Sequence, residues 1–268
     1  MPAQYGPHRW SAGYHDNGAN DAFRGSRFTV ADLAGATFLD CDMSNVKIAD
    51  SWLVDVSVSG YLSNFVVNGI DVTAFVEAEL DRRHPERVQL REIGNADDFR
   101  AMWATIERLW SGTDARAERL AETALDERVD DEWSFTETLR HLVFITDSWA
   151  SRTILDEPMP FHRLGLPQTA YAPADASALG IDVRAHPSYA EVKRARADRM
   201  AVIRGLVEGL TNAELGRICD RSPAPGYPEE GRPVGECLGV VMTEECDHHR
   251  FAVRDLEALE AQARSSDR

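Results

Sequence analysis

The stretch VGECLGVVMTEECDHHRFAVRDLEALE, residues 234–260, decides the fold of this chain. Its apolar residues recur at spacings of three and four, which predicts an amphipathic helix. The predicted buried stripe contains Leu238, Val241, Ala252, Leu256 and Leu259. Glu245 and His249 fall in the same stripe, one turn apart. Because a buried charge costs several kcal/mol unless it is paired or binds a metal, the stretch predicts a cation beside these two residues. A metal ion is the simplest candidate.

Three further amphipathic helices are predicted upstream, and each begins at a recognisable capping pattern. The capping pairs are Asn95–Asp98, Ser134–Glu137 and Ser188–Glu191. Pro233 stands where the last helix would favour its first residue. Four amphipathic helices of this length indicate a four-helix bundle. The inward residues expected in the second helix are Leu139, Leu142, Val143 and Trp149.

The connection Pro158–Ala185 is long for such a bundle, and connections of this length often serve as functional lids. Its side chains His162, Arg163 and Tyr171 are candidates for contact with a substrate.

A metal site needs ligands from more than one helix, and the second helix supplies His141. Together with Glu245 and His249 it makes a set of two imidazoles and one carboxylate. Three protein ligands with one open position are typical of catalytic zinc. The same donors could hold Fe(II) or another divalent ion such as Ni(II). The sequence therefore predicts a divalent metal at His141, Glu245 and His249.

Neighbouring residues on the last helix leave alternatives open. His248 points about 100° away from His249 and is expected behind the ligands or at the surface, with the alternative that it is the ligand in place of His249. Glu244 would take the place of Glu245 if the helix were rotated. Asp247 is a candidate for holding a ligand histidine from behind. Cys246 is more typical of packing than of catalysis. In a further alternative the site holds no metal, and Glu245 pairs with an arginine such as Arg140 or Arg250.

The chain from about residue 96 to 259 resembles the DinB-like (DinB/YfiT-like) superfamily of four-helix bundles. The resemblance rests on a histidine in the second helix and on the fourth-helix segment HHRFAVRDL, residues 248–256. It implies His141 and His249 as ligands, with Glu245 where the family commonly has a histidine. Members include metal-dependent transferases and isomerases that use a low-molecular-weight thiol such as mycothiol or bacillithiol. The resemblance therefore implies a thiol S-transferase.

The N-terminal part has a period of five, which neither a helix nor a strand produces. Large apolar residues recur at this step from Phe28 to Val58, with small or β-branched residues two positions before them. Segments such as AGATF (34–38) resemble the pentapeptide-repeat family, which implies a short right-handed β-solenoid. The fold class is thus mainly α with a β segment, a DinB-like bundle preceded by this solenoid.

The expected organisation has five parts. They are a disordered N-terminus (1–20), a pentapeptide-repeat solenoid (21–72), a capping helix over Asp71–His84 with its linker (73–94), the bundle (95–262) and a disordered tail (263–268).

Composition limits the partners. The formal net charge of −16 argues against nucleic acid and anionic membranes. The start of the chain lacks the pattern of a signal peptide, no apolar run could span a membrane, and the four scattered cysteines suit a reducing compartment. We expect a cytoplasmic enzyme with a small-molecule substrate and with a homodimer as a candidate assembly. The alternative is a non-enzymatic binding protein, either a pentapeptide-repeat mimic of DNA or a metal-free interaction module.

Overall fold

The computed structural model describes residues 22–38, 41–130, 132–168 and 171–266. The expected disordered N-terminus (1–20) lies outside these residues. The chain divides into two compact units with the boundary after Pro85. The helical unit begins at Glu86, so the short helix α3 (Glu86–Arg91) belongs to it and not to a linker.

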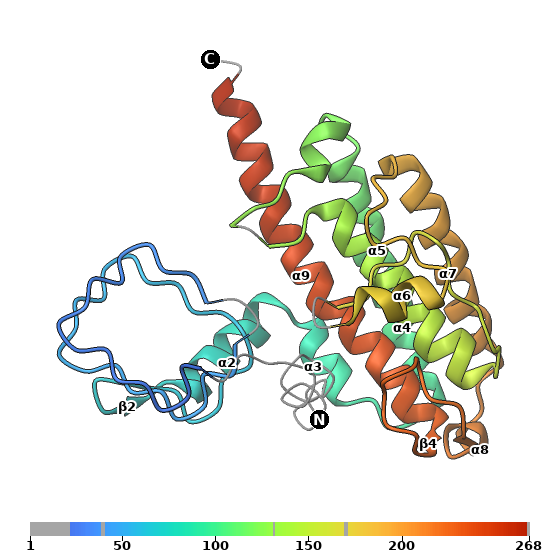
Figure 1. The fold of residues 1–268 in the computed structure, drawn as a ribbon. Coiled ribbons are helices and arrows are strands. Elements are labelled where there is room, and N and C mark those ends of the chain that lie inside the picture. The colour runs from blue at the N-terminus through green and yellow to red at the C-terminus, as the bar shows by residue number, and fades with distance from the viewer. Residues whose placement is uncertain (1–21, 39–40, 131, 169–170, 267–268) are drawn as a thin grey trace. The chain divides into compact units, whose positions relative to one another are not determined.

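The helical unit is a bundle of long helices that pack along one another (Figure 1). Its elements are α3, α4 (Ala96–Ala117), the 3₁₀ helix η2 (Glu122–Asp126), α5 (Phe135–Ile145), the π-helix η3 (Thr146–Ile154), α6 (Pro173–Ala178), α7 (Tyr189–Gly209), α8 (Asn212–Leu215), β3 (Ile218–Cys219), β4 (Arg232–Pro233) and α9 (Val234–Ser266). The core between α4, α5, η3, α7 and α9 contains fully buried side chains such as Trp103, Leu142, Trp149, Ile203 and Leu238. The expectation of a mainly helical bundle is confirmed.

The predicted helix starts are confirmed by their capping geometry. Asn95, Ser134 and Ser188 each accept a hydrogen bond from the backbone N–H three residues on, and the carboxylate of the acidic residue there accepts one from the N–H of the capping residue. These reciprocal bonds satisfy N–H groups that a helix end leaves without partners. The last helix begins at Val234, as the stretch 234–260 predicted, and Pro233, expected at its first position, instead pairs with Ile218 in the small β3–β4 ladder.

The second bundle helix does not stay α-helical. It begins as α5 and continues as η3, in which the N–H of Leu155 bonds to the carbonyl of Ala150, five residues back. A π-helical segment is rare and is often found beside functional sites. It contains the buried Asp147, whose carboxylate accepts bonds from Arg199 Nε at 2.8 Å and from the His162 N–H at 2.7 Å. Burial raises the pKa of Asp147 to about 6, although the Arg199 guanidinium opposes the shift.

One buried guanidinium fixes the long connection onto α5. Arg140 donates from Nε to the carbonyl of Leu164, from Nη1 to Ala185 and from Nη2 to Asp182, at 2.8 to 2.9 Å. The carbonyls come from both ends of the segment that the sequence marked as a candidate lid. Three hydrogen bonds donated by a charged guanidinium are stronger than three hydrogen bonds donated by neutral groups. The connection is thereby held against the helix that carries His141.

The N-terminal unit contains little regular structure. It has a two-residue hairpin, β1 (Val66–Val67) with β2 (Ile70–Asp71), followed by α2 (Thr73–Arg83), which matches the helix expected over Asp71–His84. Between residues 22 and 65 the chain winds in wide loops without a strand among the described residues (Figure 1). Left-handed backbone conformations recur there every five residues, at Gly25, Val30, Gly35, Asn45, Asp50, Asp55 and Gly60.

The expected β-solenoid is not found in this unit. No described residue between 22 and 72 is buried, and the large apolar residues of the five-residue repeat stay about half exposed, as at Leu33 (50%) and Phe38 (60%). A solenoid is stable only when neighbouring coils bury each other's faces, and this segment supplies too few of them. The five-residue period of the sequence is repeated in the left-handed backbone conformations, but the described residues from 22 to 65 form no strand ladder.

At the other end of the chain α9 runs to Ser266. Residues 263–266, expected to be part of a disordered tail, are therefore helical, and residues 267–268 lie outside the described chain. Among the described residues, none of the helices is long and apolar enough to cross a membrane.

The Arg140 contacts generate a stability prediction. Arg140→Met keeps much of the apolar side-chain volume but leaves three carbonyls without their donor. We expect a loss of about 3 kcal/mol in the free energy of unfolding, measured by urea denaturation. The matched control is Arg184→Met in the exposed part of the same connection, which should change stability by less than about 0.5 kcal/mol. Equal stability of the two variants would contradict the role given to Arg140.

Candidate metal centre

His141 is held by the backbone of the long connection. Leu166 donates its N–H to the carbonyl of Arg140 at 3.1 Å, and the carbonyl of Leu166 lies 2.9 Å from His141 Nδ1. Because a carbonyl can only accept, the proton of a neutral His141 is on Nδ1. The lone pair of Nε2 then points to the opposite side of the ring. Metal-binding histidines typically have this arrangement, with one nitrogen bonded to a carbonyl or carboxylate and the other free to ligate.

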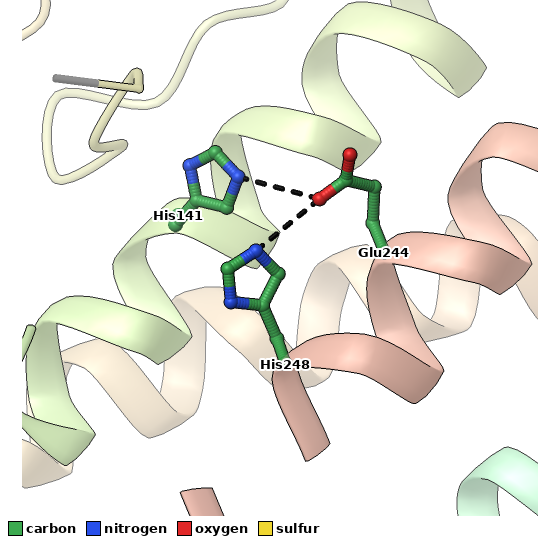
Figure 2. Close-up of side chains that lie close together, drawn as sticks. All are labelled: His141, Glu244 and His248. Carbon is green, nitrogen blue, oxygen red and sulfur yellow. Dashed lines mark ion pairs between the residues drawn. The ribbon is translucent and has the colours of Figure 1, made fainter. Parts of the chain in front are cut away.

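Glu244 of α9 faces that nitrogen, and His248 of the same helix faces the same carboxylate (Figure 2). Glu244 Oε2 lies 3.6 Å from His141 Nε2 and 3.2 Å from His248 Nε2. Each of the three residues offers a ligand atom within 4.8 Å of the others. Zinc bonded tetrahedrally at about 2.0–2.1 Å keeps its ligand atoms roughly 3.4 Å apart. The distances from Glu244 to the two imidazoles bracket this value, so the group could bind a metal ion.

The electrostatics of the group suit a cation. Burial lowers the pKa of His141, which favours the neutral ring. Burial alone would raise the pKa of Glu244, but the neighbouring imidazoles of His141 and His248 outweigh it and lower that pKa to about 2. The ionised carboxylate of Glu244 lies 3.6 Å from His141 Nε2. A carboxylate oxygen and imidazole nitrogens this close together are donor types that a divalent metal accepts.

Aromatic rings cover the two imidazoles. The Trp133 ring centroid lies 4.7 Å from that of His141 and 6.1 Å from that of His248, nearly parallel to the second at 19°. Phe251 packs edge-on against His248, one turn further along α9. Sequence reasoning missed Trp133, because it precedes the capping residue Ser134 and so lies outside every helical stripe. Its proximity comes from the chain entering α5 beside the metal ligands.

The structure places the other predicted pair elsewhere. Glu245 and His249 are buried, as the apolar stripe predicted, but they do not meet His141. Glu245 forms an ion pair with Arg196 of α7, and His249 Nε2 lies 2.8 Å from Thr113 Oγ1 of α4. Burial raises the pKa of Glu245 against the influence of Arg196. A step of one residue turns a helix by 100°, so Glu244 and His248 face α5 while Glu245 and His249 face α4 and α7.

The expected cation beside Glu245 is therefore a guanidinium. Its partner is Arg196, and not Arg140 or Arg250, which the sequence suggested as alternatives. Arg140 instead binds the long connection, and Arg250 lies 3.5 Å from Asp247.

The remaining candidates do not join the metal group. The side chain of Asp247 is 39% exposed and faces Arg250. Cys246 is buried, and burial raises the pKa of its thiol, which keeps it protonated and unreactive. In the long connection, His162 Nδ1 accepts from the Leu164 N–H and the Tyr171 hydroxyl donates to the carbonyl of Pro225. Arg163 lies 3.7 Å from Asp182 within the same connection. These side chains support the loops around the site.

Comparison with family models shows which family the chain resembles. The model of the DinB superfamily matches residues 105–252, which is more than half of the chain and includes His141, Glu244 and His248. The comparison gives no match to a pentapeptide-repeat family. No curated protein and no solved structure matches the chain.

The position of Trp133 generates a spectroscopic prediction. A paramagnetic ion between His141, Glu244 and His248 would lie close to its ring, so Co²⁺ should quench part of the tryptophan fluorescence. Trp133→Phe should remove that part of the quenching without preventing Co²⁺ from binding. Trp52→Phe, which changes a fully exposed ring in the N-terminal unit, serves as the control and should keep the quenching. The same quenching in all three proteins would place the ion elsewhere.

Proposed function

This chain belongs to the DinB superfamily, and from that premise we propose that it is a metal-dependent enzyme whose ion is held by His141, Glu244 and His248. The observation that supports the proposal most strongly is the convergence of these three donors around one point (Figure 2). The set has the composition that the sequence predicted, two imidazoles and a carboxylate. The carboxylate and the second imidazole come from Glu244 and His248, on the face of α9 next to the one that carries the predicted Glu245 and His249. Zinc is the ion we expect first, with Fe(II) or Ni(II) as alternatives that the same donors accept.

The charge of the site favours an anionic co-substrate. Neutral His141 and His248 with ionised Glu244 would leave a divalent site with a net charge of about +1. When bound, the ion would stabilise a thiolate in its open position, which is the nucleophilic form of a thiol. Burial of His141 and its bond to Leu166 keep that ligand neutral and oriented. Trp133 covers the imidazoles and limits the access of water to them.

The co-substrate that we propose is a low-molecular-weight thiol of the mycothiol or bacillithiol type. Its sulfur would form a bond to an electrophilic carbon of a small substrate, and the leaving group would depart with its bonding electron pair. The thiol proton would go to solvent or base when the thiolate forms. The thiol is supported by the resemblance to the superfamily and by the site charge, and the electrophile is a small molecule of undetermined identity.

The metal assignment is tested by binding. Protein purified without a histidine tag and freed of metal by chelation should bind one equivalent of Zn²⁺, measured by calorimetry. His141→Ala, Glu244→Gln and His248→Ala should each weaken binding by more than the roughly 10–100-fold that loss of an outer partner costs. His186→Ala changes an exposed histidine that directly follows the long connection, and this variant should bind as the unchanged protein does. Binding that survives all three ligand changes would refute the site.

The thiol is tested separately on Co²⁺-loaded protein. A thiol that ligates the ion should produce a sulfur-to-cobalt charge-transfer band, and the band should be absent from the His248→Ala protein. Mycothiol, bacillithiol and glutathione are compared at equal concentration, with the matching alcohol-containing analogue as control. If the protein binds Co²⁺ and none of the thiols produces the band, the metal site stands and the thiol function fails.

A further inference from the structure

Helix α9 carries two successive carboxylate–imidazole pairs of the same kind. Glu244 with His248 and Glu245 with His249 both have a spacing of four, and the second pair is offset from the first by one residue. A rotation of α9 by about 100° would bring the second pair to the place of the first. The two pairs offer the same donor types, so donor chemistry alone does not decide which pair meets His141. Some other contact must select the rotation.

The second pair is held by partners that the first pair does not have. The clamp consists of Glu245 with Arg196 and of His249 with Thr113. Glu245 is fully buried and Arg196 is 4% exposed, and they form an ion pair between α9 and α7. His249 Nε2 lies 2.8 Å from Thr113 Oγ1, which ties α9 to α4. The contacts reach two different helices, so together they restrict rotation of α9 in both directions.

Trp110 of α4 packs against both halves of the clamp. Its ring lies edge-on to His249, with centroids 5.1 Å apart at 81°, and the Arg196 guanidinium carbon is 5.7 Å from its ring centroid. A guanidinium over an indole face gains attraction from the ring quadrupole. The clamp is therefore one contiguous polar cluster between α4, α7 and α9.

Stability alone does not account for this cluster. A buried ion pair is often no more stabilising than well-packed apolar residues of similar volume. Here the pair is also incompletely bonded, because among the described residues Glu245 Oε1 and Arg196 Nε and Nη1 have no hydrogen-bond partner. The best-attested use of such costly buried pairs is to specify one register over another. A rotated α9 would separate Glu245 from Arg196 and leave two buried charges unpaired.

We propose that Arg196, acting through Glu245, is a positioning residue that fixes the rotation of α9 and so presents Glu244 and His248 to His141. The inference rests on the proposed metal site and deepens it. Arg196 does not touch the ion. It determines which carboxylate and which imidazole are available to it.

The test replaces the ion pair by apolar residues of similar size. Arg196→Met combined with Glu245→Leu removes the charges together, so neither is left buried alone. We expect the urea midpoint to be unchanged or higher, whereas Zn²⁺ affinity falls at least about tenfold. The visible spectrum of bound Co²⁺ should change as well, because the ligand geometry changes. A residue that only stabilised the bundle would leave metal binding intact once the midpoint is preserved.

Two further variants complete the test. Arg196→Lys keeps a cation beside Glu245 but loses the planar guanidinium over Trp110, so it should bind Zn²⁺ more tightly than the apolar double variant. Arg204→Gln with Glu107→Gln removes an exposed ion pair that also joins α7 to α4, and it should alter neither affinity nor spectrum. If the apolar double variant binds Zn²⁺ as tightly as the unchanged protein and keeps its Co²⁺ spectrum, the inference is overturned. If the unchanged protein itself binds no metal, the proposed function is wrong, and the inference is overturned because it depends on that metal site.

Discussion

Helix α9 has to bury two carboxylates and two imidazoles on adjacent faces, and each carboxylate needs a positive partner inside the bundle. Glu245 takes a guanidinium from α7, whereas Glu244 meets two imidazoles, one from α5 and one from its own helix. The two solutions differ in a way that matters chemically. A guanidinium has no acceptor and cannot bind a metal, whereas an imidazole can ligate an ion together with its carboxylate neighbour.

The surroundings of the site reinforce this arrangement from α5. Arg140 and His141 are neighbours in the sequence, and both bind the same connection. The Arg140 guanidinium takes three of its carbonyls, while His141 takes the carbonyl of Leu166. The contacts that hold the loop therefore also determine which nitrogen of His141 faces α9. Fold stability and ligand orientation depend on the same short segment of α5.

Much of the bundle could be predicted from local pattern. The capping pairs at Asn95, Ser134 and Ser188 depend only on residues three apart, and each determined a helix start correctly. The burial of Glu245 and His249 was also predictable from the apolar stripe. The sequence did not predict which pair faces His141, Glu245 with His249 or Glu244 with His248. That choice depends on Arg196, which lies about 50 residues away on another helix. Trp133 carried no periodic signal, and the five-residue period near the N-terminus could not reveal that the repeats are too few to bury one another.

Diffraction from crystals of the zinc-loaded protein, with anomalous scattering at the zinc edge, measures the central claim most directly. We predict a single strong peak about 2.0–2.1 Å from the Nε2 atoms of His141 and His248 and about 2.0–2.2 Å from a carboxylate oxygen of Glu244. Arg196 should remain paired with Glu245 in the same crystal. A peak coordinated by Glu245 or His249, or no peak between α5 and α9, would contradict it.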